Sequence, residues 1–296
     1  MAKAGTQQRP TKHMHMLLYV AVLAFVIVMA IASGLGIAFG GQRGKSNAAP
    51  TSDTAQPDTT ESQENSSGYE PSGYYDGTYI DEVVIDHDKN DDGLPDSDEG
   101  YLVGVDVSEW NNDLDWETIQ RGGIQFAILR CGITVGDNKT HEVDEQFKRN
   151  VEECERLNIP YGVYYFSSAD DASEANAEAR FVLSVIKDCN PRLPVFIDLE
   201  QSYMGDFEWM DTIKDISQAF CTTISAAGYE PGVYASVSWW EYLMTDPCYD
   251  QWAKWVADYS GYCTYADADC WQYTSQGEIY GTDWLIDLNI WYLKEA

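Results

Sequence analysis

Four acidic residues follow short apolar runs, where β-strands of a barrel would deliver side chains for chemistry. Asp106 stands in LVGVDVS, Asp198 and Glu200 stand in LPVFIDLE, and Asp287 stands in WLIDLN. Asp198 and Glu200 are two residues apart, so on one strand both side chains point to the same face, with about 6.5–7 Å between their Cα atoms. Because the carboxyl ends of parallel barrel strands meet at one face, we expect the four carboxylates to gather there.

Clustered carboxylates with few cations nearby are suited to proton transfer. Such groups raise one another's pKa, and a carboxyl group that stays protonated near neutral pH can donate its proton to a glycosidic oxygen. This is the chemical requirement of glycoside hydrolysis. Each residue alone has a structural alternative, because an Asp after a strand also caps the next helix or pairs with Arg. The four together favour a catalytic site.

Aromatic residues are concentrated around the same predicted strand ends. Flat rings suit the apolar faces of sugar rings, although about half or more of such residues fill the core or the rim of a site. The candidates for substrate binding are Tyr164, Tyr165, Trp255, Trp271 and Tyr273.

Short apolar runs alternate with amphipathic stretches from residue 101 to the end, and each run predicts a strand. The predicted strands are Leu102–Val107, Phe126–Arg130, Tyr161–Phe166, Val195–Leu199, Gly232–Ala235, Trp255–Ala257, Trp271–Tyr273 and Leu285–Leu288. Helical spacing between some of them predicts one helix through Phe147 and Leu157, another through Phe181 and Ile186, and a third that ends at Ala227 before Gly228. Eight strands with helices between them indicate an α/β fold, an irregular (β/α)8-like TIM barrel. After Gly228 the connections are too short for full helices, so we expect an incomplete helical coat.

The residues before the barrel divide into four further segments, 1–16, 17–39, 40–79 and 80–100. Residues 17–39, LLYVAVLAFVIVMAIASGLGIAF, contain no charge, and as a helix of about 35 Å they would span a bilayer. They predict a transmembrane anchor with residues 1–16 in the cytoplasm and the rest outside the cell. The alternative is a signal segment cleaved after Ala32, since Ala30-Ile31-Ala32 resembles a processing site and would give a secreted protein. Residues 40–79 are rich in Gly, Ser, Thr and Pro and predict a disordered linker.

An Asp-rich stretch within residues 80–100, DHDKNDDGLPDSDEG, has the ligand spacing of a twelve-residue calcium loop. The flanking runs YIDEVVI and YLVGVDV indicate strands and not the helices of an EF-hand, so an acidic linker is the alternative. The candidate Ca²⁺ ligands are Asp88, Asn90, Asp92, Leu94 through its carbonyl, Asp96 and Glu99. Any Ca²⁺ would be structural, and we expect no cofactor for catalysis.

The charge balance restricts the partners of the chain. Its 18 basic and 49 acidic residues give a net charge of −31, which repels the phosphates of nucleic acids and the charged surfaces of anionic membranes. Seven cysteines include no CxxC pair, which argues against zinc and redox sites. If the protein is exported, Cys248, Cys263 and Cys270 are the closest candidates for disulfide pairing, whereas Cys154 and Cys221 are expected to be buried thiols.

An ordered set of motifs gives the chain a specific resemblance. Residues 101–292 contain, in order, GVDVSEWNNDLDW, QFAILRCG, IPYGVYYFS, LPVFIDLE, YEPGVYAS, KWVADY, CWQYTSQG and GTDWLIDLN. This sequence resembles glycoside hydrolase family 25, the Chalaropsis-type lysozymes or 1,4-β-N-acetylmuramidases. The resemblance implies that residues 101–296 form a catalytic barrel that hydrolyses the β-1,4 bond between N-acetylmuramic acid and N-acetylglucosamine in peptidoglycan.

The resemblance also implies roles for individual residues. Glu200 would be the general acid/base, and Asp198 would polarise the substrate's 2-acetamido group, whose attack on the anomeric carbon gives retention. Spacing alone leaves open whether Asp198 is instead a covalent nucleophile. Asp106 and Asp287 would hold this pair and the sugar, and Tyr164 and Trp271 would be among the sugar contacts.

Three interpretations follow from these observations. The first is an active, tethered muramidase that acts on the wall of the producing cell. The second is a non-catalytic glycan-binding protein on the same barrel, against which the four intact carboxylates argue. The third is a secreted lysozyme directed at other bacteria or used by a phage, which requires cleavage of the signal segment.

Overall fold

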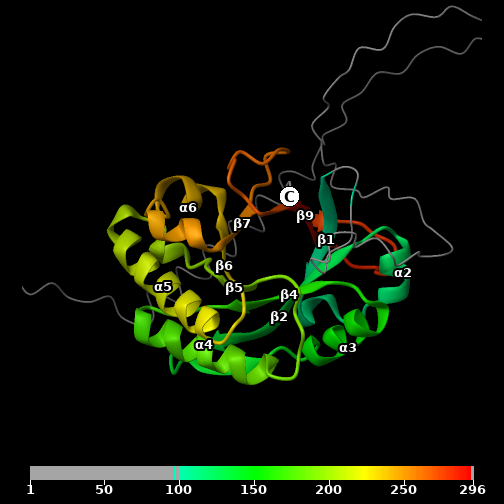
Figure 1. Cartoon of the computed structure of the whole chain (residues 1–296), viewed down its shortest axis with the longest axis horizontal. Coiled ribbons are helices and arrows are strands. Elements are labelled where there is room, and N and C mark those ends of the chain that lie inside the picture. Colours follow the sequence, from blue (N-terminus) through cyan, green and yellow to red (C-terminus); the bar gives the residue numbers. More distant parts are fainter. Residues whose placement is uncertain (1–96, 98–99, 295–296) are drawn as a thin grey trace, which may run out of the picture. The chain divides into compact units, whose positions relative to one another are not determined.

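The computed structural model describes residue 97 and residues 100–294 (Figure 1). The predicted anchor at 17–39, the linker at 40–79 and all six candidate calcium ligands therefore lie outside the described residues. In the part of the chain that is described, no helix combines the length and the apolar character needed to cross a membrane.

Eight strands close into a barrel, and each contains or overlaps one of the strands predicted from the sequence. They pair in the order β1, β2, β4, β5, β6, β7, β8, β9 and back to β1. Their bounds are β1 (Tyr101–Val107), β2 (Phe126–Val135), β4 (Tyr161–Phe166), β5 (Val195–Asp198), β6 (Pro231–Ser236), β7 (Ala253–Ala257), β8 (Cys270–Gly277) and β9 (Ile286–Tyr292). The prediction of an eight-stranded α/β barrel is confirmed.

The barrel departs from the predicted parallel arrangement at two places. Strand β9 runs antiparallel to both of its neighbours, β1 and β8. A ninth strand, β3 (Thr140–Val143), which the sequence did not predict, pairs antiparallel with the end of β2 outside the ring. The expectation that Asp287 ends a strand is therefore wrong, because Asp287 is the second residue of β9.

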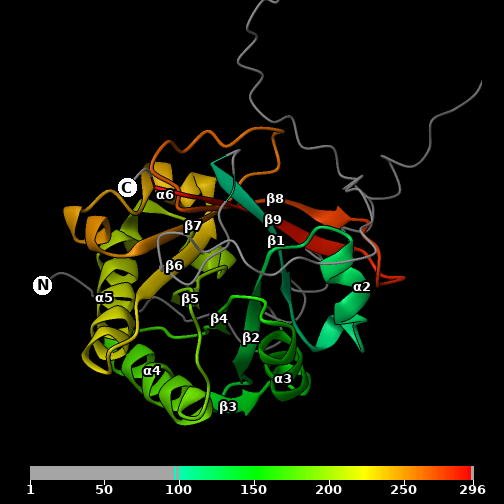
Figure 2. The same cartoon turned by 45° about the vertical axis from the view of Figure 1, so that its right-hand side comes forward.

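Helices cover only part of the barrel. The longer ones are α3 (Phe147–Leu157), α4 (Ala172–Ile186) and α5 (Met210–Ala226), and the short ones are α2 (Trp116–Arg121) and α6 (Val237–Tyr242). In the described chain the connections from β7 to β8 and from β8 to β9 contain no helix (Figure 2). The incomplete coat is thus confirmed.

Local signals in the sequence account for the ends of the helices. The Asp171 side chain accepts hydrogen bonds from the backbone amides of Ser173 and Glu174 and caps the start of α4. Helix α5 ends before Gly228, whose φ of +91° is a left-handed conformation that favours glycine.

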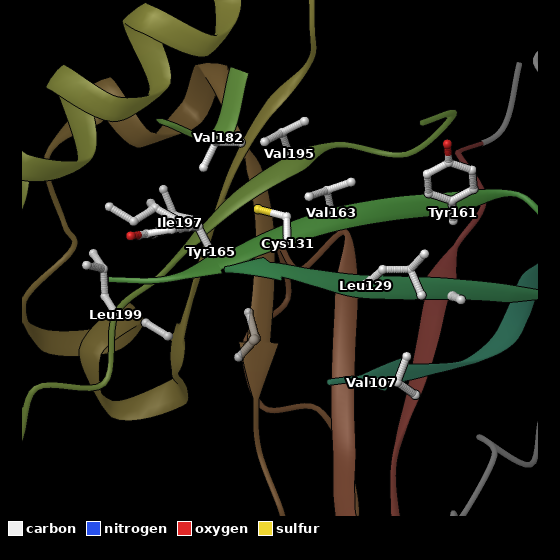
Figure 3. Packing of buried hydrophobic residues seen from close by; sticks show 14 of the residues in the cluster. Val107, Leu129, Cys131, Tyr161, Val163, Tyr165, Val182, Val195, Ile197 and Leu199 are labelled. Atoms are coloured by element: carbon white, nitrogen blue, oxygen red, sulfur yellow. The ribbon is translucent and has the colours of Figure 1, made fainter. Parts of the chain in front are cut away.

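Alternation along the strands divides the core into two layers. One buried cluster takes residues from seven of the eight barrel strands and none from a helix, so it fills the barrel interior; its members include Phe126, Phe196 and Trp255. A larger cluster joins the outward faces of the strands to the helices. Figure 3 shows part of this outer layer, including Leu129, Val163 and Ile197 of the strands and Val182 of α4.

Two glycines are required by this interior packing. A Cβ atom on Gly104 would lie 2.4 Å from the Phe126 ring, and one on Gly232 would lie 2.3 Å from the Phe196 ring. The two Phe rings therefore occupy the space beside these glycines and fill the interior below the carboxylates.

The seven cysteines all lie within the described residues and are free thiols. The expected pairing among Cys248, Cys263 and Cys270 is therefore absent, and Cys270 is buried in the barrel interior. Cys154 and Cys221 are fully buried, as predicted.

Candidate active site

The four predicted carboxylates come together at one end of the barrel. Asp106 near the end of β1 is paired in register with Asp287 near the start of antiparallel β9, so their Cα atoms are direct cross-strand neighbours. Asp198 ends β5, and Glu200 lies two residues beyond it. Electrostatic coupling links Asp198 to each of the other three residues. We call Asp106, Asp198, Glu200 and Asp287 the carboxylate cluster.

Asp106 is held by a network of amide side chains. Its Oδ2 accepts hydrogen bonds from Gln272 Nε2 at 2.9 Å and from Asn289 Nδ2 at 2.7 Å. The Trp255 indole donates to Asn289 Oδ1 at 2.8 Å, and the Tyr259 hydroxyl donates to Gln272 Oε1 at 2.5 Å. Because these donors occupy the amide oxygens, both NH₂ groups are directed at the Asp106 carboxylate.

The environment of the cluster opposes ionisation. Burial raises the pKa of Asp106 to about 6, while the hydrogen bonds from Asn289 and Gln272 limit the rise. Burial raises the pKa of Asp287 to about 8, and the nearby charges of Asp106 and Glu200 act in the same direction. At neutral pH the cluster therefore retains protons that isolated carboxylates would have lost.

Asp198 is the most strongly perturbed member of the cluster. It is 5% exposed, and burial followed by the charges of Glu200 and Asp106 raises its pKa well above the usual range. Among the described residues, its Oδ1 atom is buried and has no hydrogen-bond partner. An acceptor of this kind is costly unless a ligand supplies the missing donor.

Glu200 is the member that solvent and a ligand can reach. The residue is exposed, yet surrounding protein desolvates its carboxyl group enough to raise its pKa, and a hydrogen bond from Tyr234 opposes that rise. Glu200 thus combines accessibility with a proton that is retained to higher pH than usual, as a general acid requires.

Arg130 on β2 is a basic residue near the cluster that the sequence analysis missed. Its side chain is 5% exposed and lowers the pKa of Asp198 through its positive charge. Its Nε lies 2.7 Å from Asp144 Oδ2, and its Nη2 lies 2.9 Å from Glu109 Oε1. These two acidic residues hold the guanidinium, so Arg130 offsets only part of the cluster's negative charge.

Comparison with known proteins shows the family of this chain. The model of Glycosyl hydrolases family 25 matches residues 105–282, more than half of the chain. The chain belongs to this family. The matched region contains Asp106, Asp198 and Glu200 and ends shortly before Asp287.

Individual family 25 relatives have low sequence identity to this chain, but the matched regions cover about two thirds of it or more. Lysozyme M1 of Streptomyces globisporus is 25% identical over 219 residues, which are 65% of this chain and 68% of the relative. The modular autolysin LytC of Streptococcus pneumoniae, solved with a synthetic peptidoglycan ligand, has a TM-score of 0.58 and 25% identity, and the match covers 67% of this chain. It spans 48% of LytC, about half of that protein. A family 25 glycosyl hydrolase of Bacillus anthracis shares the fold, with a TM-score of 0.54 and 20% identity over 72% of this chain and 96% of that one.

The predicted substrate-binding aromatics separate into two groups in this family 25 barrel. Tyr164 and Trp255 point into the interior, where Tyr164 is electrostatically coupled to Asp106 and Asp198. Tyr165, Trp271 and Tyr273 belong instead to the outer core layer. Their side chains are buried on the face of the strands opposite to the cluster, and their contact with the substrate stays a prediction.

Other aromatics on the carboxylate side of the family 25 barrel are open to solvent. They are Trp110 after β1, Tyr203 and Phe207 after β5, Tyr259 and Tyr262 after β7, and Tyr280 and Trp284 after β8. The loops that surround the cluster therefore present rings suited to stacking on sugars.

Alternation along the strands contains the signal for several missed residues. Gln272 lies between Trp271 and Tyr273, and Asn289 lies two residues after Asp287 on the same face of β9.

In the described part of this family 25 chain, no group of three or more His, Cys, Asp or Glu side chains could hold a metal ion.

Proposed function

We propose that this family 25 chain hydrolyses the glycan strands of bacterial peptidoglycan, with Glu200 as the general acid/base. The observation that carries the proposal is the carboxylate cluster, in which the exposed Glu200 lies beside the buried Asp198. Two relatives support the substrate, since one is named a lysozyme and the other is an autolysin solved with a peptidoglycan ligand.

The scissile bond in this proposal is the β-1,4 linkage between N-acetylmuramic acid and N-acetylglucosamine. Glu200 protonates the glycosidic oxygen as that bond breaks and then removes a proton from the water that attacks the anomeric carbon. The raised pKa of Glu200 supports its protonated starting state.

Asp198 assists the reaction through the substrate's own acetamido group. The unpartnered Oδ1 of Asp198 is suited to accept a hydrogen bond from the acetamido N–H, which increases the negative charge on the acetamido oxygen. That oxygen attacks the anomeric carbon, and subsequent attack by water gives net retention of configuration. Gln272 and Asn289 orient Asp106 on β1, and burial together with the negative charge of Asp106 raises the pKa of Asp198.

Release of reducing ends from purified peptidoglycan tests the proposed reaction. We expect the folded protein to release them, and proton NMR at early times should show the β-anomer before mutarotation. Glycan whose N-acetyl groups have been removed should resist cleavage, because it lacks the attacking oxygen. If no reducing ends are released, the alternative of a non-catalytic glycan-binding protein is favoured. Cleavage of de-N-acetylated glycan at the full rate would contradict the role assigned to Asp198.

We further propose that residues 17–39 anchor the enzyme in the cell membrane, with the barrel outside and residues 40–79 as a flexible connection. The uncharged length of the segment supports this proposal. After cell fractionation, the full-length chain should be found in the membrane pellet. Recovery of a shortened chain in the medium would instead support signal cleavage near Ala32.

We also propose that residues 88–99 form a structural Ca²⁺ site. The spacing of their ligand residues supports this proposal. Isothermal titration with Ca²⁺ should show one binding site, and chelation should lower the melting temperature of the full-length chain. Asp88→Asn together with Glu99→Gln should abolish both effects. If the titration shows no binding and chelation leaves the melting temperature unchanged, the segment is an acidic linker.

A further inference from the structure

The loop between β8 and β9 encloses a hollow on the same side of the barrel as the carboxylate cluster. The hollow has a volume of about 310 Å³, and the described residues that line it all lie within 278–285. Because β9 runs antiparallel to β1, its first residues lie at the end of the barrel where β1 finishes. Leu285, which lines the hollow, precedes Asp287 by two residues, a distance of about 7 Å along an extended chain.

The loop that forms this hollow is fixed to the rest of the barrel. The carbonyl of Gly281 accepts a hydrogen bond from the Asp115 amide at the start of α2. A Cβ on Gly281 would lie 2.6 Å from Ile119, and the φ of this glycine is +97°. The Thr282 hydroxyl accepts a hydrogen bond from the Trp284 amide at 2.9 Å. These contacts hold the loop in shape before any ligand binds, which reduces the entropy lost on binding.

The side chains that line the hollow combine stacking surfaces with hydrogen-bond acceptors. Trp284 is 55% exposed and Tyr280 is 44% exposed. Glu278 and Asp283 add carboxylate acceptors, and none of the described residues that line the hollow is Lys or Arg. Flat rings beside acceptors match a pyranose ring that donates hydroxyl and amide protons. The two carboxylates disfavour an anionic ligand and can accept hydrogen bonds from an uncharged sugar.

We propose that the hollow at residues 278–285 is a distal glycan subsite that binds an uncharged N-acetylated sugar, with Trp284 as its stacking platform. This inference rests on the proposed function, because a strand cleaved beside Glu200 and Asp287 would pass the adjoining β8–β9 loop. The subsite binds sugars remote from the cleaved bond and therefore favours long strands over short fragments.

Kinetics of Trp284→Ala on strands of two lengths test the subsite. For long, purified glycan strands we expect KM to rise about tenfold more than for the shortest fragment that the enzyme cleaves, which is the loss of one good stacking contact. Tyr242→Ala is the matched control, because Tyr242 is 58% exposed on α6 and lies outside the hollow. Equal changes in KM for long and short substrates would overturn the proposal.

A binding measurement separates the subsite from the reaction. In the Glu200→Gln background, titration with the uncharged tetramer of N-acetylglucosamine should quench tryptophan fluorescence, and adding Trp284→Ala should weaken binding about tenfold. Unchanged affinity for the tetramer would overturn the subsite even if the wild-type enzyme cleaves peptidoglycan. Weakened affinity would support the subsite even if the wild-type protein releases no reducing ends, in which case the proposed reaction fails by itself.

Discussion

Replacing Glu200 by Gln should lower the rate of reducing-end release from peptidoglycan by roughly 10³-fold or more, within the range of general acid–base catalysis. Glutamine keeps the size of the side chain, but its amide has no acidic proton that could be transferred to the leaving oxygen. The fold should persist and the melting temperature should stay equal or rise, because the substitution removes a negative charge from the carboxylate cluster.

Glu208→Gln provides the matched control for this experiment. Glu208 is exposed in the same β5–α5 connection, so the substitution removes one charge from the same region and leaves the cluster intact. The control should keep wild-type turnover. Undiminished turnover in Glu200→Gln would refute the assignment of Glu200 as the acid.

The free energy of unfolding should fall as pH rises from about 4 to about 8, because Asp106 and Asp287 lose their protons in the folded protein over this range. The folded pKa values of Asp106 and Asp287 are raised from 3.8 to about 6 and about 8, so the native state binds more protons than the unfolded state in this window. The stabilisation is complete below the unfolded pKa and is lost as pH rises through the folded values. The melting temperature should therefore fall by roughly 5 °C or more across this window.

Thermal melts across this window check the prediction. Asp287→Asn should flatten the dependence between about pH 6 and pH 8, since the amide does not titrate there. Asp188→Asn, which changes a side chain that is 85% exposed at the end of α4, should leave the slope unchanged. A melting temperature that rises with pH over this range would contradict the described environment of the cluster.

The strands and the longer helices were predictable because their signals are local. Each barrel strand has a short apolar run of its own, and helices α3, α4 and α5 have apolar residues at helical spacing. The direction of β9 and the pairing of β3 depend on contacts between segments distant in sequence, which local periodicity does not encode. The gathering of Asp106 with Asp287 was therefore predicted correctly from an incorrect strand direction.

The aromatic residues show a second limit of sequence analysis. Both faces of a barrel strand are buried, so alternation along CWQYTSQG fixes two sets of residues without showing which set points inward. In the structure Gln272 faces inward to Asp106, and Trp271 and Tyr273 face the outer core. The hydrogen bond between Asp106 and Gln272 of β8 is a tertiary contact, and it shows which set of β8 residues points inward.

Mass spectrometry of the fragments released from purified peptidoglycan tests the central claim most directly. A muramidase cleaves after N-acetylmuramic acid, so the fragments formed by wild-type protein and lost in Glu200→Gln should carry that sugar at their reducing ends. Fragments that end in reducing N-acetylglucosamine, or an intact glycan beside cleaved peptides, would contradict the proposed reaction.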